Sequence, residues 1–290
     1  MPDHGRFATF ILTHGRPENV ITLPALRKAG YTGRVFLVID NEDSKGDQYR
    51  TCFGPANVVE FDKAAVAETF DTADIEQDRR TIVYARNACF AIARDLGLDY
   101  FLQLDDDYKD FLYRSVTEGG ALIRSFDSVV EVMLTFLDDS GAVSVAMAQG
   151  GDYMGGATAD KPLLKRKAMN SFFLRTDRLL TFVGRINEDV NTYVVEGARG
   201  RLFFTVMALQ LNQVQTQQSY GGMTEVYRAL GTYAKSFYTV MMAPSCVSIR
   251  SLGRNDRRVH HFIEWDHAVP KIISEQYRKA VNTLPAGVPS

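Results

Sequence analysis

Residues 100–107 read YFLQLDDD, a short apolar run that passes directly into three consecutive aspartates. The run has the length and composition of a buried strand, and we predict a strand over Tyr100–Leu104. In an extended segment Asp105 and Asp107 project to the same side of the chain. Two such carboxylates, with diphosphate oxygens and water, make an octahedral site for Mg²⁺ or Mn²⁺. A solvated acidic turn is the alternative interpretation.

The sequence before this stretch alternates strand-like and helix-like segments. Apolar runs of strand length occupy residues 7–13 (FATFILT), 34–39 (RVFLVI) and 57–61. We predict a helix over 17–28, after the first run, and a helix over 78–96, between the third run and the strand at 100–104; a glycine follows each helix. Strands that are continuous apolar runs separated by helices predict an α/β fold, with a mostly parallel sheet covered on both faces. Ligands of such sheets bind beyond the carboxyl ends of the strands.

The sequence after this stretch is less regular, and no linker divides the chain. We predict a helix over 127–137 and a second one that opens at Ile186–Asp189. The predicted strands are residues 142–148, 169–175 and 202–209, and the predicted loops are the glycine-rich 150–156 and the glutamine-rich 211–222.

Composition narrows the class of protein. The 290 residues are 46% apolar, and 33 Lys and Arg against 35 Asp and Glu give a net charge of −2. The chain therefore lacks the net positive charge of proteins that coat nucleic acid through bulk charge. Three scattered cysteines indicate a reducing compartment, and no apolar run approaches the ~20 residues that span a bilayer. We expect a soluble, cytoplasmic protein.

Charged residues also follow the other predicted strands. His14, Gly15 and Arg16 follow the first strand, and Asp40 ends the second. A carboxylate at that position can accept hydrogen bonds from a nucleobase or a ribose, and an acidic turn is the alternative. Arg86 lies on the helix before the acidic strand, where it could offset diphosphate or carboxylate charge. A solvated helix face is the alternative for Arg86.

Two later pairs are further candidates. Glu188 and Asp189 stand at the start of a predicted helix, where carboxylates are often only caps; the functional interpretation is a general base for an incoming hydroxyl. His260 and His261 are adjacent, and in a strand they would point to opposite faces, so only one could be a metal ligand. A core or surface histidine is the alternative for each.

The order of the candidate residues over about residues 7–265 resembles that in the GT-A class of glycosyltransferases. In chain order these are Asp40, Arg86, Asp105-x-Asp107, Glu188-Asp189 and a late histidine. The resemblance implies that the aspartates of the DXD motif hold a divalent metal on the diphosphate of a nucleotide-sugar. It implies a metal site of Asp105, Asp107 and His260 or His261, a donor site of Thr13, His14, Arg16, Asp40, Arg86 and Asp106, and a catalytic pair of Asp189, the base of inverting members, with Glu188.

Two blocks carry a narrower resemblance. Both blocks look like the TET-associated glycosyltransferases of bacteriophages. The first is Ile11–Pro17 (ILTHGRP), and the second is Ala85-Arg86-Asn87 followed by Leu102–Tyr108 (LQLDDDY). This resemblance implies transfer of a sugar from a nucleotide-sugar, expected to be a UDP-sugar, to the hydroxyl of a 5-hydroxymethylpyrimidine such as 5-hydroxymethylcytosine in phage DNA. It also implies one GT-A domain over 1–290: a nucleotide-sugar half (about 1–110), an acceptor half (about 111–270), and a C-terminal helix and tail (271–290).

Two local basic clusters suit a DNA acceptor despite the nearly neutral total charge. Residues 161–167 hold four cations in seven positions, and residues 250–258 hold four in nine. The expected DNA contacts are Lys165, Arg166, Lys167, Arg254, Arg257 and Arg258. Solvated loops are the alternative for both clusters. A small-molecule or cell-surface acceptor, or a nucleotidyltransferase, remains the alternative for the function, although the glycine-rich triphosphate loop of the latter is missing after the first strand.

Overall fold

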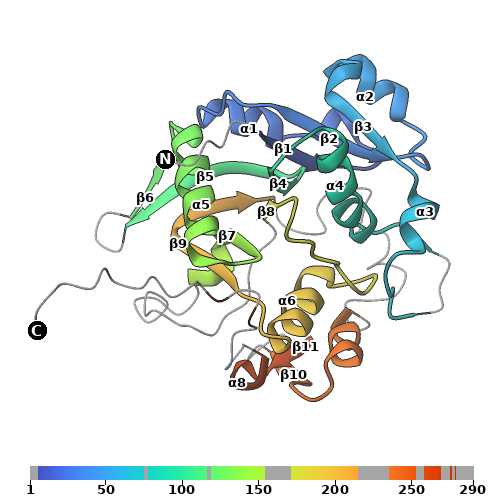
Figure 1. The fold of residues 1–290 in the computed structure, drawn as a ribbon, viewed down its shortest axis with the longest axis vertical. Helices are drawn as coiled ribbons and strands as arrows, with labels where there is room; N and C mark the ends of the chain where they lie inside the picture. The colour runs from blue at the N-terminus through green and yellow to red at the C-terminus, as the bar shows by residue number, and fades with distance from the viewer. Residues whose placement is uncertain are drawn as a thin grey trace, which may run out of the picture.

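A computed structural model describes residues 6–74, 78–115, 119–153, 171–214, 235–252 and 258–268, with Glu275 and Arg278. In this part of the chain a nine-stranded sheet forms the centre, in the order β3-β2-β1-β4-β8-β7-β9-β5-β6, and a two-stranded sheet lies at one end (Figure 1). The strands are β1 (Phe7–Leu12), β2 (Val35–Asp40), β3 (Val58–Phe61), β4 (Tyr100–Asp105), β5 (Tyr108–Ser115), β6 (Gly119–Leu122), β7 (Ser144–Gln149), β8 (Phe172–Arg175), β9 (Phe203–Gln213), β10 (Val247–Leu252) and β11 (Arg258–Ile263). The α-helices are α1 (Thr22–Lys28), α2 (Gly46–Phe53), α3 (Lys63–Ala67), α4 (Val83–Asp95), α5 (Phe126–Ser140), α6 (Glu188–Ala198) and α8 (Trp265–Ala268).

The first strands of the chain form the parallel part of the large sheet. β1 lies between β2 and β4, β3 follows β2, and all three pairings are parallel. The register places Leu12 opposite both Val38 and Asp105. These strands are the continuous apolar runs of the sequence, and the predicted α/β fold with its helix-covered parallel strands is confirmed.

The later strands make the sheet mixed. β8 pairs antiparallel with both β4 and β7, and β5 pairs antiparallel with β6 and β9, whereas β7 and β9 are parallel. One sheet therefore takes strands from both halves of the chain.

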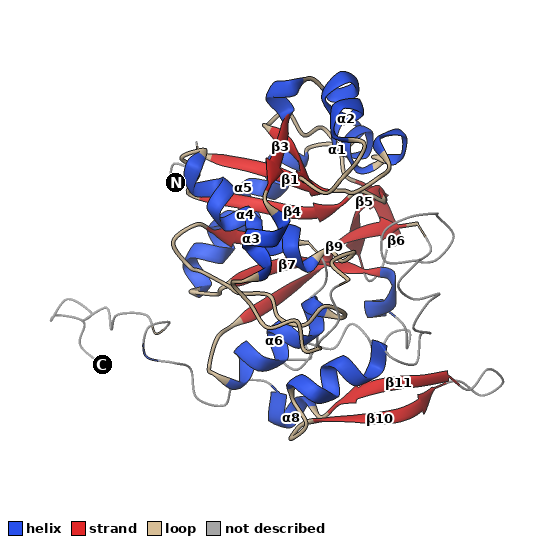
Figure 2. Cartoon of the chain, turned by 90° about the vertical axis from the view of Figure 1, so that its right-hand side faces the viewer, coloured by secondary structure: helices blue, strands red, loops and turns tan. Residues whose placement is uncertain are grey.

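Helices cover both faces of the parallel strands (Figure 2). On β1, Ile11 packs in one core cluster with Leu26 of α1 and Leu134 of α5. The neighbouring Phe10 packs in the other core cluster with Phe90 of α4. This alternation follows from the two-residue period of a strand and explains why β1 is apolar at nearly every position.

Two predicted helix boundaries are wrong. The helix predicted from Asp78 begins at Val83, because the Asp78 carboxylate accepts hydrogen bonds from the backbone N–H and guanidinium of Arg80 in a turn before the helix. The helix predicted from Pro17 is a short 3₁₀ turn, Pro17–Asn19, followed by α1 from Thr22.

The small sheet packs beside α6, at the end of the molecule opposite α1 and α2 (Figure 2). β10 and β11 are antiparallel, and Val247 and Ile263 at its base share a core cluster with Val190 and Val194 of α6. The histidine pair thus lies in β11. None of the helices that the structure describes is long and apolar enough to cross a membrane.

Candidate active site

The candidate active site lies where β1, β2 and β4 end. Because these strands are neighbours, the loop after β1, Asp40 at the end of β2 and the acidic turn after β4 share one edge of the sheet. The acidic turn is defined as Asp105–Asp107. This carboxyl edge is where parallel α/β sheets bind their ligands.

Asp106, the central residue of the acidic turn, is turned into the protein, with 1% of its side chain exposed. Arg16 donates to it from Nε (2.8 Å) and Nη2 (2.6 Å), a two-pronged pair, and Thr13 Oγ1 donates at 2.6 Å. Burial acts against the charge of Arg16, yet Asp106 raises its pKa. These contacts give Asp106 the role of holding Thr13 and Arg16 in place.

Tyr49 of α2 fixes the same loop from the other side. Its hydroxyl accepts a hydrogen bond from the Arg16 backbone N–H at 2.9 Å and lies 2.9 Å from Thr13 Oγ1. Because the Thr13 hydroxyl donates to Asp106, the Tyr49 hydroxyl donates to Thr13. Burial raises the pKa of Tyr49 to about 12, so the phenol stays protonated and able to donate.

Thr22, the first residue of α1, braces the backbone of the acidic turn. Its N–H donates to the carbonyl of Asp106 at 3.1 Å. Its hydroxyl donates to the carbonyl of Asp105 at 2.7 Å and accepts from the N–H of Tyr108 at 2.8 Å. The turn is therefore fixed by contacts that do not use its carboxylates.

His14 and Asp40 form a pair at the ends of β1 and β2. His14 Nδ1 lies 2.8 Å from Asp40 Oδ2, and the buried Lys63 places its Nζ 3.3 Å from Oδ1. Burial raises the pKa of Asp40, but His14 and Lys63 outweigh burial and lower it overall. With 38% of its side chain exposed against 6% for Asp40, His14 is the more accessible member of the pair.

Arg86 joins the acidic turn to the start of α6. Its side chain is fully buried, and it donates from Nη2 to Asp105 Oδ1 and from Nε to Glu188 Oε1, both at 2.9 Å. The guanidinium also lies over the rings of Phe172 and Phe182. Because the Arg86 side chain is fully buried, it is neither part of a solvated helix face nor exposed for direct contact with a bound donor. Arg86 therefore acts on the two carboxylates that it holds.

Burial raises the pKa of two carboxyl groups at this edge. The pKa of Asp107 rises to about 7 because its side chain is partly buried and lies beside the charges of Asp105 and Asp106. Gln213 of β9 partly offsets this by donating to both Asp107 oxygens, at 2.9 and 3.1 Å. The pKa of Glu188 also rises to about 7, mainly through burial and against the charge of Arg86.

Asp189 follows Glu188 in the first turn of α6. It is half-buried, and no described residue forms an ion pair or hydrogen bond with its carboxylate. The residue before this pair, Asn187, has a left-handed φ of 59° and donates from Nδ2 to the carbonyl of Lys235 at 3.0 Å. The Asn187 side chain thus ties the start of α6 to the segment that carries Lys235.

The histidine pair lies near the start of α6. His261 Nδ1 is 3.4 Å from Asn187 Nδ2, and His260 Nδ1 is 2.7 Å from the carbonyl of His261. Within the described ranges, no three His, Cys, Asp or Glu side chains are grouped so that they could hold a metal ion. The structure therefore does not bring either histidine together with Asp105 and Asp107 as one ligand set.

The acidic turn fits a cation that arrives with a diphosphate. Its two outer residues supply carboxylate oxygens, and the pKa of Asp107 is raised first by burial and then by crowded negative charge, which a cation would relieve. Mg²⁺ is commonly held by one or two carboxylates together with substrate phosphates. Asp105 and Asp107 are the residues that would hold it.

Four residues at this edge were not predicted from the sequence: Thr22, Tyr49, Lys63 and Gln213. Their contacts span between 23 and 106 positions, and none lies in a recognisable motif. For Lys63 there was a local signal, since it follows the third strand at the same edge of the sheet.

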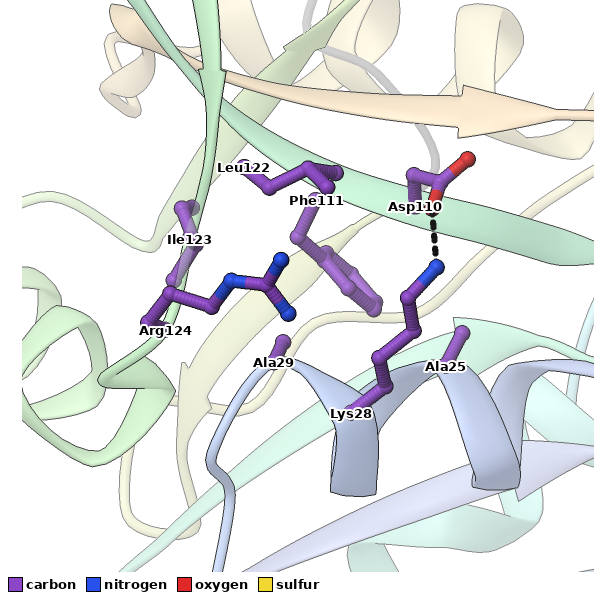
Figure 3. Close-up of a pocket in the computed structure, with 8 residues that line it drawn as sticks. All are labelled: Ala25, Lys28, Ala29, Asp110, Phe111, Leu122, Ile123 and Arg124. Atoms are coloured by element: carbon purple, nitrogen blue, oxygen red, sulfur yellow. Dashed lines mark hydrogen bonds and ion pairs between the residues drawn. The ribbon is translucent and has the colours of Figure 1, made fainter.

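One surface hollow lies apart from the acidic turn, and the side chains predicted to contact DNA are not among the described ones. Lys165, Arg166, Lys167, Arg254 and Arg257, and the side chain of Arg258, fall outside the described residues. The small pocket in Figure 3 is lined by residues of α1, β5 and β6, with Lys28 and Asp110 paired at 3.4 Å across its rim. It does not include any residue of the acidic turn.

Comparison with known proteins adds three findings. A family model described as TET-associated glycosyltransferase matches residues 7–222. No curated protein matches the sequence. Among solved structures, glucosyl-3-phosphoglycerate synthase of Mycobacterium tuberculosis, in complex with Mg²⁺ and UDP, is 10% identical with a TM-score of 0.49, over 89% of this chain and 87% of that one. Mannosyl-3-phosphoglycerate synthase of Rubrobacter xylanophilus is 11% identical with a TM-score of 0.39, over 89% and 86%.

The family match spans well over half of the chain. It includes the loop after β1, the acidic turn, Arg86 and the Glu188-Asp189 pair. The chain therefore belongs to the TET-associated glycosyltransferase family and is a glycosyltransferase.

Proposed function

We propose that this glycosyltransferase moves a sugar from a UDP-sugar to the hydroxyl of a 5-hydroxymethylpyrimidine in phage DNA, with Mn²⁺ or Mg²⁺ at the acidic turn. The observation that carries the proposal is the buried link from Asp105 through Arg86 to Glu188. This link holds a carboxylate suited to a cation and the helix start that carries Asp189 in one rigid unit. Donor activation and acceptor activation need such proximity.

The donor would bind over the loop after β1. Thr13 and Arg16 are fixed by Asp106 and Tyr49 before any ligand arrives, so little conformational entropy is lost on binding. His14, backed by Asp40, offers an accessible ring for a base or ribose. We assign the nucleoside to these residues, and to Asp106 the task of holding Arg16.

Asp105 and Asp107 would hold the metal ion. When bound, the ion neutralises negative charge on the departing diphosphate. Arg86 orients Asp105 from the buried side, with its Nη2 on one carboxylate oxygen. Gln213 orients Asp107 in the same way from β9.

Asp189 is the group that we assign as general base. Its carboxylate takes the proton of the acceptor hydroxyl while that oxygen forms a bond to the anomeric carbon of the sugar. The bond between this carbon and the diphosphate oxygen breaks, and UDP leaves with the electron pair. A half-buried carboxylate with no partner among the described residues supports this role. Glu188, held by Arg86, fixes the turn of helix from which Asp189 acts.

The β10–β11 ribbon supports DNA as the acceptor. Its inner face packs beside α6, while Arg250, opposite His260 in the register, is half-exposed and lies over the ring of Phe262. The surface pair of Arg250 with Glu264 is weak enough for a phosphate to replace it. A two-stranded ribbon fits the major groove of DNA. A target base in duplex DNA would be flipped out to reach Asp189.

The test is UDP release from a panel of UDP-sugars with Mn²⁺, measured with hydroxymethylated DNA, with the same DNA unmodified, and without DNA. We expect release to rise only with hydroxymethylated DNA and to be lost in Asp107→Asn. Asp110→Asn is the matched control, because Asp110 lies on β5 outside the acidic turn and pairs with Lys28 at the surface.

Each other outcome contradicts a defined part of the proposal. Release that is indifferent to DNA assigns a different acceptor. Pyrophosphate release from a nucleoside triphosphate, with no UDP release from any donor, indicates a nucleotidyltransferase. Full activity in Asp107→Asn removes the metal from the acidic turn.

A further inference from the structure

The loop that leads into α6, residues 181–187, is largely buried although it has no regular secondary structure. The N–H of Gly184 donates to the carbonyl of Asp71 at 2.8 Å, and the N–H of Arg185 donates to the carbonyl of Thr72 at 2.7 Å. A segment far away in the sequence, after α3, therefore holds the backbone of this loop.

Arg185 is the centre of a second set of contacts at the same place. Its side chain is 1% exposed, and Nε donates to Asp74 Oδ2 at 2.7 Å. Nη2 donates to the hydroxyl of Tyr238 at 2.9 Å, and that hydroxyl donates to the same Asp74 oxygen. Arg185, Asp74 and Tyr238 thus form a closed buried triad, with Asp78 3.6 Å from Nη1.

The triad connects three distant parts of the chain just before the proposed base. Asp74 belongs to the segment after α3, and Tyr238 lies in a helical segment at 235–242. The same helical segment accepts a hydrogen bond from Asn187, at the carbonyl of Lys235. Arg185 is two residues from Asn187 and four from Asp189, so the loop is held at both points immediately before α6 begins.

We propose that Arg185 is a positioning residue: through Asp74 and Tyr238 it fixes the loop before α6 and so places the Asp189 carboxylate against the acceptor hydroxyl. The inference rests on the proposed function, because it requires Asp189 to be the base. With no ion-pair or hydrogen-bond partner among the described residues, Asp189 takes its position from the backbone. A displacement of about 1 Å at a reacting group can cost about 100-fold in rate.

The planar fork of Arg185 cannot be replaced by a lysine, which has one nitrogen in place of three. We expect Arg185→Lys and Tyr238→Phe to lower the rate of transfer about 10- to 100-fold, with KM for the donor and for DNA unchanged. Tyr238→Phe removes only a hydroxyl, so it tests the proposal even if Arg185→Lys does not fold. Arg175→Lys is the matched control, since Arg175 also bridges two carboxylates, those of Asp138 and Asp177, but lies on β8 away from the loop.

The deciding experiment combines Tyr238→Phe with Asp189→Asn. Single-turnover rates are measured with excess enzyme, both as transfer to hydroxymethylated DNA and as UDP release to water, so the result does not depend on the DNA acceptor. If the triad acts through Asp189, Tyr238→Phe lowers the rate in the wild-type background and leaves the rate of Asp189→Asn unchanged. Equal losses in both backgrounds would indicate a general structural role and overturn the proposal.

The same data separate this inference from the proposed function. A wild-type rate in Asp189→Asn means that Asp189 is not the base, and the proposed function fails on that point. A low rate in Asp189→Asn with wild-type rates in Arg185→Lys and Tyr238→Phe removes the positioning role alone.

Discussion

The three consecutive aspartates of the acidic turn make three different sets of contacts. Asp105 accepts from Arg86, Asp106 is buried against Arg16 and Thr13, and Asp107 accepts from Gln213. Asp105 ends β4 and the other two aspartates lie in the turn that follows, yet the outer pair and the central residue still have separate partners, as alternation along an extended segment predicts. That much could be predicted from the sequence; the identity of each partner could not.

The raised pKa of Asp107 predicts that the stability of the protein depends on pH. Its pKa rises from an ordinary value of 3.8 to about 7 in the folded protein. Between these two values the folded chain keeps a proton that the unfolded chain has lost, so the free energy of unfolding falls as pH rises from about 4 to about 7. Without metal, Asp107→Asn should therefore raise the melting temperature at pH 8 and leave it nearly unchanged at pH 4.

Thermal unfolding in EDTA and in Mn²⁺, at both pH values, checks this prediction. Mn²⁺ should stabilise the wild-type protein at pH 8 and not the Asp107→Asn variant. Asp110→Asn, on the surface of β5, should follow the wild type in every condition. A lower melting temperature for Asp107→Asn at pH 8 in EDTA would show that crowded charge at the acidic turn does not destabilise the fold.

At the element scale, β1, β2 and β4 could be predicted to within about one residue. Buried parallel strands are apolar on both faces, so each is a continuous apolar run bounded by charged residues. β5 (YKDFLYRS) was not predicted, because it carries charged residues among its apolar ones and begins directly after the acidic turn. β9 continues to Gln213, three residues into the stretch predicted as a polar loop, because it pairs with β5 there.

The conformation of the loop before α6 requires a glycine at position 184. Gly184 has φ +83°, and a Cβ added there would lie 2.2 Å from Asn191 Nδ2. That amide nitrogen donates to the carbonyl of Ile186 at 2.9 Å, inside the loop that precedes Asp189. We expect Gly184→Ala to lower the free energy of unfolding by about 2 kcal/mol or more and to reduce turnover.

Gly97→Ala is the matched control for this element. Gly97 also has a positive φ, +66°, but nothing lies within 4 Å of an added Cβ. The substitution should cost about 1 kcal/mol, from the backbone conformation alone, with turnover unchanged. Urea unfolding and turnover of both variants check the comparison, and equal losses of activity would mean that the packing of the loop on Asn191 is unimportant.

At the scale of the whole molecule, long-range pairs decide the site. Arg86 and Glu188 are 102 positions apart, Arg16 and Asp106 are 90 apart, and Arg185 and Asp74 are 111 apart. The sequence identifies several of these residues by their place at strand ends or helix starts. Local sequence patterns do not indicate which of them form pairs, because the pairing depends on the order of strands in the sheet.

Charge on the whole molecule predicts how DNA binding depends on salt. The chain carries a net charge of −2, so the proposed attraction to DNA would come from local clusters such as Lys165, Arg166 and Lys167. Replacing these three residues by alanine should weaken DNA binding and reduce the slope of log K against log salt by about 2 to 3. The same replacement at Lys28, Lys45 and Arg50, in the first half of the chain, should leave the slope unchanged. Titrations at several salt concentrations measure both, and an unchanged slope in the first variant removes that cluster from the acceptor site.

A crystal structure of the protein with UDP and Mn²⁺, with anomalous scattering used to locate the manganese, tests directly whether the acidic turn holds the metal and the donor. We expect one manganese peak at the carboxylates of Asp105 and Asp107 and at the UDP diphosphate, with the nucleoside over His14 and Asp40. A manganese peak on His260 or His261 away from the acidic turn, or bound UDP with no manganese at Asp105 and Asp107, would contradict this expectation.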